Sequence, residues 1–181
     1  MKIVIDPGHG GRDPGAIGAN GCHEELINLK IAGRVKALLE NYHDVSITRV
    51  FRGLSSNHEL SLAARVKMAE NSDLLVSIHC NAHTDPKARG IEVFYYPGSV
   101  PGLMAAQKVL IYAGETIEAI AGYRIPNRGA KANREFYLLN RTVCPAILIE
   151  CGFISNPDEC KLLTSPLGEI ALGAAIAAAL V

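Results

Sequence analysis

The sequence has no tryptophan, few aromatic residues and no net charge. Its 181 residues include 18 basic and 18 acidic side chains, and aromatic residues make up only 6%. A balanced charge without basic blocks argues against a protein that binds nucleic acid or an anionic membrane, because either partner requires a basic face. Hydrophobic residues make up 49%, which predicts an aliphatic core. The length suits one well-buried domain and is short for two.

Paired cysteine motifs and targeting patterns are also missing. The five cysteines are an odd number and form no CxxC pair, so neither a disulfide framework nor a thiolate zinc site is expected. No basic and apolar leader pattern is visible, which predicts synthesis in the cytoplasm without a signal peptide. The apolar ending IALGAAIAAALV is shorter than the roughly 20 residues that a membrane span needs, and predicts a buried helix packed on a sheet.

Strand-like and helix-like segments alternate along the chain. Apolar β-branched runs predict strands at 2–6, 44–49, 73–80, 90–96, 135–140 and 145–150. Helical spacing and capping signals predict helices at 24–41, at 58–70 behind a capping box at 56–59, at 103–121, from 157 and from 166. This order predicts a single α/β domain over residues 1–181. Its central sheet would be mostly parallel or mixed, with about six strands and helices on both faces.

Ionisable residues stand where three predicted strands end. In open α/β sheets, ligands bind beyond the carboxyl ends of the strands. His9 follows the first strand, His79 and Glu150 each close a later one, and Glu24 and Glu25 begin the first helix. Two histidines and a glutamate, with the fourth position left to water, are a ligand set for a catalytic zinc ion. The residues alone do not choose between the two neighbouring glutamates.

Glycines surround His9 in the segment GHGGRDPG. Gly8, Gly10 and Gly11 permit a sharp turn after the strand, which would aim the His9 ring at the other donors. A phosphate-binding loop is the alternative for this segment. It lacks the GxGxxG spacing and no GK[ST] follows, so the pattern favours a metal ligand over a nucleotide site.

The other histidines have simpler interpretations. His83 would pair with His79 as a metal ligand only on a helix, whereas His79 ends a predicted strand. His23, His43 and His58 are predicted to face solvent. None of the four is therefore expected among the metal ligands.

Glu150 is costly to bury unless it is paired or lies at a cleft. The structural alternative to a functional role is an ion pair with an arginine such as Arg65. Cys80 and Cys151 each follow a candidate site residue, and strand alternation turns them toward the core. A thiol hydrolase that uses Cys151 with a histidine remains an alternative, although no orienting group is near it in the sequence.

Five segments together carry a family resemblance. They are IDPGHGGRDPGAIG, HEELINLKIA, LAARVKMAENSDLLVSIHCNAH, ARGIEVFYY and PAILIECGFISNPDE. The chain resembles, over nearly its whole length, the catalytic domain of zinc-dependent N-acetylmuramoyl-L-alanine amidases, which occur as bacterial cell-wall amidases and in phage endolysins. The resemblance implies His9, Glu24 and His79 as ligands of one Zn²⁺ and Glu150 as the catalytic carboxylate, and so selects Glu24 over its neighbour.

Three further residues lie in family-like segments. Arg65, Asn81 and Asn133 are candidates for supporting hydrogen bonds or for contact with the substrate. A purely structural role is the alternative for Arg65 and Asn133.

The resemblance also implies an activity. The expected reaction is hydrolysis of the amide between the lactyl group of N-acetylmuramic acid and L-alanine in peptidoglycan. The protein would act at the bacterial cell wall, as a phage or prophage lysin or as a domain of a secreted amidase. It is expected to be a monomer without a separate wall-binding domain, a nucleic-acid partner or a membrane partner. A zinc hydrolase of another cell-wall amide and a non-catalytic peptidoglycan-binding module are the alternatives.

Overall fold

The computed structural model describes residues 1–48 and 60–181. Within these residues, six strands form one sheet in the order β2-β1-β3-β6-β4-β5. The pairs β1–β2, β1–β3, β3–β6 and β4–β5 are parallel, and β4 runs antiparallel to β6. The strands are β1 (Lys2–Pro7), β2 (Asp44–Ile47), β3 (Leu74–Asn81), β4 (Ile91–Tyr95), β5 (Asn127–Ala132) and β6 (Ala146–Phe153). The predicted α/β fold with a mixed six-stranded sheet is confirmed.

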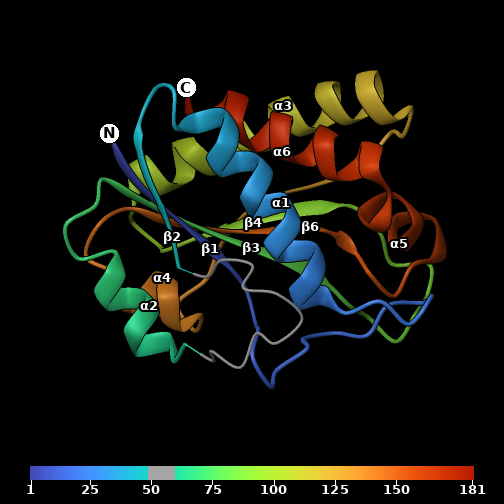
Figure 1. Cartoon of the computed structure of the whole chain (residues 1–181), viewed down its shortest axis with the longest axis horizontal. Helices are drawn as coiled ribbons and strands as arrows, with labels where there is room; N and C mark the ends of the chain where they lie inside the picture. Colours follow the sequence, from blue (N-terminus) through green and yellow to red (C-terminus); the bar gives the residue numbers. More distant parts are fainter. Residues whose placement is uncertain (49–59) are drawn as a thin grey trace.

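Helices cover both faces of this sheet (Figure 1). α1, α3 and α6 lie on one face, with α6 packed chiefly against α1 and α3, while α2 and α4 lie on the other. Among the described residues, no single helix is long and apolar enough to span a membrane; only α5 and α6, bent by 80°, pass that test as a pair. The helices are α1 (Glu24–Leu39), α2 (Leu62–Met68), α3 (Val100–Ala121), α4 (Tyr137–Arg141), α5 (Pro157–Thr164) and α6 (Pro166–Leu180).

Alternation along the central strands divides the core in two. Residues such as Val76, Ile78 and Ile149 face the large cluster beneath α1, α3 and α6. Their neighbours Leu75 and Leu148 face a smaller cluster beneath α2 and α4. Further along that second face, the alternation places charged side chains instead of apolar ones, so the smaller cluster borders a polar region.

One predicted strand is a helix. The segment 135–140 was expected to be extended because it is rich in aromatic and aliphatic residues, but α4 occupies 137–140 of it. Asn133 Oδ1 accepts the backbone N–H groups of Glu135 and Phe136, which turns the chain there. The sixth strand is β5, whose polar sequence NRGAKA lies at an edge of the sheet and carries little strand signal.

Other boundaries differ from expectation. α2 begins at Leu62, where Ser61 Oγ accepts the backbone N–H of Ala64. Four predicted features lie outside the described residues. They are the capping box at 56–59, the start of the helix at 58–70, the last residue of the strand at 44–49, and His58. β3 and β6 continue beyond His79 and Glu150, so these two side chains lie near the ends of their strands rather than at the last position.

The cysteines behave as predicted. All five lie in the described part of the chain and are free. Cys80, Cys151 and Cys160 are buried in the large core cluster, and Cys22 packs against its border. Strand alternation thus turns Cys151 away from the polar face, and the thiol-hydrolase alternative receives no support from its position.

Candidate metal centre

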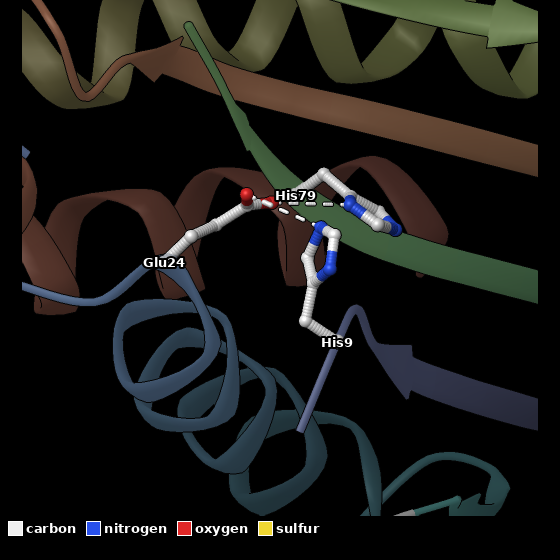
Figure 2. A group of neighbouring side chains, drawn as sticks. All are labelled: His9, Glu24 and His79. Atoms are coloured by element: carbon white, nitrogen blue, oxygen red, sulfur yellow. Dashed lines mark hydrogen bonds and ion pairs between the residues drawn. The ribbon is translucent and has the colours of Figure 1, made fainter. Parts of the chain in front are cut away.

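Three side chains from distant parts of the chain meet at one end of the sheet (Figure 2). His9 lies in the loop after β1, Glu24 is the first residue of α1, and His79 lies in β3. One donor atom from each lies within 4.8 Å of the other two. His79 Nδ1 is 3.1 Å from Glu24 Oε1, and His9 Nε2 is 3.2 Å from Glu24 Oε2. Two imidazoles and a carboxylate at these separations could hold a metal ion.

The charges of this cluster are strongly coupled. Burial raises the pKa of Glu24, but hydrogen bonds with His79 and His9 outweigh it and hold that pKa well below its usual range. The hydrogen bond to Glu24 raises the pKa of His9 to about 9, although burial opposes the shift. In the metal-free protein, His9 therefore carries a proton near neutral pH and shares it with Glu24 in their hydrogen bond. A cation that enters the cluster has to displace that proton, because only neutral imidazole is a ligand.

The glycine-rich turn after β1 places the His9 ring. His9 itself has a positive φ of 62°, which is uncommon for a residue with a side chain. Gly10 and Gly11, with φ values of 114° and 68°, continue the turn, as their glycine identity predicts. Gly8 has a different function: a Cβ there would lie 2.2 Å from Cε1 of His79. The first glycine therefore provides room for the second histidine.

Asp13 orients the His9 ring from the side opposite Glu24. Its Oδ2 is 2.8 Å from His9 Nδ1, and its Oδ1 accepts the backbone N–H of Gly15 at 3.0 Å. A carboxylate on the second ring nitrogen fixes which nitrogen of a histidine is free to bind a metal. Asp13 was not among the predicted site residues; its one signal in the sequence is an acid four residues after a candidate ligand histidine, within the same loop.

Glu24 is held by four groups besides His9. Its Oε1 accepts hydrogen bonds from Asn28 Nδ2 at 3.2 Å and from the Cys80 backbone N–H at 3.0 Å, and Oε2 accepts the Ala16 N–H at 2.9 Å. His79 is the fourth partner. Asn28 is fully buried one helical turn after Glu24, so the i,i+4 spacing was a usable signal that the sequence analysis missed.

Arg65 fixes the backbone of the same loop. It is buried and donates to Asp6 Oδ1 at 2.7 Å, to the Pro7 carbonyl at 2.8 Å and to the His9 carbonyl at 2.6 Å. Arg65 thus pairs with Asp6 rather than with Glu150, and the ion pair considered as the alternative for Glu150 is wrong. The contacts of Arg65 support a structural role beneath the cluster.

Glu150 is the neighbour of His79 across the sheet. In the sheet it is aligned with His79 of β3 on one side and with Glu92 of β4 on the other. Its Oε2 is buried and has no hydrogen-bond partner among the described residues. Burial raises the pKa of Glu150 to about 7; the charges of Glu24 and Glu92 add to the shift, and that of His79 opposes it. A carboxyl group with a free oxygen and a pKa near neutrality suits a general base.

Glu92, which the sequence analysis did not single out, is heavily bonded. Asn81 Nδ2 donates to its Oε1 at 2.8 Å, and Arg128 Nε donates to its Oε2 at 2.8 Å. Lys131 Nζ also donates to Oε2. Asn81 therefore forms a supporting hydrogen bond at the border of the cluster, one of the two roles expected for it.

A cavity of about 300 Å³ opens beside the two histidines. Its wall includes Asp13, Arg65 and Leu138, so it lies between the loop after β1 and the helices α2 and α4. A larger cavity of about 470 Å³, where the end of α3 meets α5 and α6, has none of the three donors in its wall. The cavity of about 300 Å³ is therefore where a reacting group can approach the three donors.

Residues 3–181 match the profile of the N-acetylmuramoyl-L-alanine amidase family. The chain belongs to this family. It is 37% identical over 175 residues to the endolysin of Bacillus phage SPP1, with 95% of this chain and 63% of the endolysin aligned. The sporulation-specific N-acetylmuramoyl-L-alanine amidase of Bacillus subtilis is 36% identical, over 91% of this chain and 61% of that protein. This amidase-family chain thus spans less than two thirds of both relatives.

Solved amidase structures have the same fold. The N-acetylmuramoyl-L-alanine amidase AmiC2 of Nostoc punctiforme superposes with a TM-score of 0.88 at 34% identity, over 99% of this chain and 94% of that one. The catalytic domain of CwlV from Bacillus (Paenibacillus) polymyxa gives 0.86 at 29% identity, over 99% and 96%. The amidase-family fold therefore extends over the full chain.

The remaining candidates of this amidase-family chain lie apart from the donors. Asn133 caps the turn before α4, which supports the structural alternative for it. His23 is exposed at the start of α1, and His83 Nδ1 accepts the backbone N–H of Asp85. His43 is half-buried, with Nε2 3.1 Å from the carbonyl oxygen of Leu180, so it is only partly exposed at the surface.

Proposed function

We propose that this chain is a zinc-dependent amidase that cleaves the bond between the lactyl group of N-acetylmuramic acid and L-alanine in peptidoglycan. Membership of the N-acetylmuramoyl-L-alanine amidase family supports the choice of bond. The observation that carries the proposal is the convergence of three metal donors within 4.8 Å beside a buried glutamate oxygen that has no hydrogen-bond partner among the described residues.

The proposed metal ligands are His9, Glu24 and His79. The donor set fits zinc, because catalytic zinc sites use three nitrogen or carboxylate ligands and leave one position open. Zinc in such a site supplies a Lewis acid, which polarises a carbonyl group and lowers the pKa of water. The short loop hydrogen bonds of Asp13 and Arg65 would keep His9 in place when the metal binds.

Glu150 is the proposed general base. Its pKa of about 7, raised by burial, lets it take a proton from the attacking water near neutral pH and pass it to the departing amine of L-alanine. Its unpartnered Oε2 is available for that proton. The cavity bordered by Gly8, Arg65 and Leu138 would receive part of the substrate beside the histidines.

The family and the structure also support a setting for the reaction. Residues 1–181 would form the catalytic unit and act at the bacterial cell wall, as part of a phage or prophage lysin or of a bacterial amidase. We propose a monomer whose partner is peptidoglycan rather than nucleic acid or a membrane. Size-exclusion chromatography with light scattering would give one chain per particle in this case.

The test compares wild type with Glu150→Gln on purified peptidoglycan. Released N-terminal L-alanine is quantified with zinc present, after chelation, and after zinc is restored. We expect wild type to release product only with zinc, and Glu150→Gln with zinc to be about 10²- to 10⁴-fold slower, the usual contribution of a general base. Glu118→Gln, which changes an exposed glutamate on α3, is the matched control and should retain activity.

Two results would contradict the proposal. New reducing sugar ends without new alanine amino ends would show that another bond is cleaved. Wall binding without any product from zinc-loaded wild type would instead support the peptidoglycan-binding module.

A further inference from the structure

A row of charged side chains crosses three neighbouring strands at the candidate site. His79 of β3 is aligned with Glu150 of β6, and Glu150 is aligned with Glu92 of β4. Residues directly opposite each other on neighbouring strands share a face, with Cβ atoms about 5 Å apart. Two glutamates in that relation repel each other when both are ionised, so this placement is unfavourable unless something compensates it.

Hydrogen bonds and ion pairs compensate the burial and the repulsion of the Glu92 carboxylate. It is only 4% exposed, yet Asn81, Arg128 and Lys131 all donate to its carboxylate. These contacts hold the pKa of Glu92 below its usual range despite burial. Glu92 is therefore held in its ionised form, and Arg128 and Lys131 are both bound to it.

Glu150 has the opposite surroundings. Its Oε2 finds no hydrogen-bond partner among the described residues, although two cations are bound to the glutamate on the next strand. The Arg128 guanidinium and the Lys131 ammonium lie on flexible side chains long enough to reach from one glutamate to its neighbour. Both are bound to the Glu92 carboxylate.

We propose that Glu92 is a positioning residue that binds Arg128 and Lys131 and thereby keeps both cations off the Glu150 carboxylate. The proposal rests on the role of Glu150 given under the proposed function. A cation paired with the carboxylate occupies one of its oxygens and stabilises its ionised form, so the base accepts the proton of water less readily. Glu92 thus acts on the reaction through Glu150, without contact to the substrate.

Both cations have secondary contacts that keep them close to the row. The Arg128 guanidinium lies 4.9 Å from the centre of the Phe153 ring and donates to the Arg89 carbonyl at 3.3 Å. The Lys131 ammonium lies 5.8 Å from the centre of the Phe94 ring. Removal of the Glu92 charge should therefore leave the two cations near the row, beside the position where Glu150 is aligned with residue 92.

The test is a set of variants assayed on a soluble N-acetylmuramoyl peptide. Glu92→Gln keeps the size of the side chain and its ability to accept from Asn81, but removes the charge that binds Arg128 and Lys131. We expect kcat to fall about 10- to 100-fold, part of the contribution of a general base, with KM and zinc content unchanged. The triple variant E92Q/R128Q/K131Q removes anion and cations together and should regain most of the lost kcat.

A crystal structure of Glu92→Gln gives a readout that does not depend on activity. We expect the Lys131 ammonium or the Arg128 guanidinium within hydrogen-bond distance of the Glu150 carboxylate. Glu118→Gln is the matched control, because it breaks the exposed Glu118–Arg124 ion pair and should leave kcat unchanged.

Three outcomes would overturn the proposal. The first is an unchanged kcat in Glu92→Gln. The second is a folded, zinc-loaded triple variant as slow as Glu92→Gln. The third is a rise in KM at constant kcat, which would mean that the cluster binds substrate. If Glu92→Gln does not fold, E92Q/R128Q is compared with the triple variant, and an equal kcat contradicts the proposal because Lys131 then has no inhibitory effect.

Failure of the proposed function is distinguishable from these outcomes. Full activity in Glu150→Gln would remove Glu150 as the base. The crystal structure of Glu92→Gln would still show whether Lys131 or Arg128 moves to Glu150, and so would test the positioning role of Glu92 separately.

Discussion

The ring of His79 packs against the backbone of Gly8, so the candidate metal centre depends on a residue without a side chain. A Cβ at Gly8 would approach all three of Cε1, Nε2 and Nδ1 of that ring to 2.6 Å or less. The ring cannot keep its place beside such an atom. The sequence analysis expected this glycine to serve the turn, and the structure adds the close approach as the reason for it.

Gly8→Ala should therefore displace the His79 ring and weaken zinc binding. We expect affinity to fall by about 10-fold or more, the range seen when ligand orientation is lost. The measurement is competition with a chromophoric chelator. Gly33→Ala is the control, because Gly33 lies in α1 with nothing within 4 Å of a built Cβ. That control should keep zinc affinity and gain about 0.5–1 kcal/mol of stability. Equal zinc affinity in Gly8→Ala and wild type would contradict the argument.

Sequence patterns identified the donors better than the groups that orient them. His9 and His79 could be predicted because each follows or nearly ends an apolar strand, where the topology of parallel sheets concentrates ligands. Asp6 and Glu92 were missed because their partners lie on other elements, whereas Asn28 has its partner Glu24 one turn away on the same helix. Only the packed structure shows that Asp6 meets Arg65 from α2, or that Glu92 meets Arg128 from β5.

The segment around α4 shows where secondary structure could not be predicted from residue propensity. Strand propensity favoured an extended chain at 135–140, but the side chain of Asn133 captures two backbone N–H groups and starts a turn. Leu138 and Leu139 then pack into the small core cluster from a helix. Tertiary burial and one local hydrogen-bonding residue together outweighed the intrinsic preference of six residues.

Asn133→Ala tests whether that residue is structural. We expect a loss of about 1–2 kcal/mol in the free energy of unfolding, because two backbone donors lose their acceptor, with kcat/KM unchanged in the folded protein. Urea denaturation and the peptide assay measure the two effects. Asn140→Ala, at an exposed position of α4, should change neither. A fall in kcat/KM at full stability would mean that Asn133 contacts the substrate.

Buried carboxylates make the stability of this protein depend on pH. Several carboxylates are buried, and those of Glu24 and Glu92 have a lowered pKa because of their partners. A lowered pKa in the folded state contributes stability above the unfolded pKa and loses it as the pH falls through the folded value. The metal-free protein should therefore lose stability from about pH 5 downward.

Glu92→Gln isolates one part of this acid sensitivity. The free energy of unfolding of wild type minus that of the variant should shrink as the pH falls from about 5 to 3, because protonated Glu92 no longer attracts Arg128 and Lys131. Urea denaturation at several pH values gives this difference. A difference that stays constant over the range would mean that Glu92 is not ionised in the folded protein.

The reversal of chain direction between β6 and β4 has a consequence for how this fold can diversify. Because β4 and β5 begin where β1, β3 and β6 end, the connections 82–90 and 122–126 both open on the edge that carries the metal donors. Neither contains His9, Glu24 or His79. Libraries confined to these two connections would vary that edge of the sheet while the three metal donors stay constant. They are the natural starting points for changing which substrate the proposed amidase accepts.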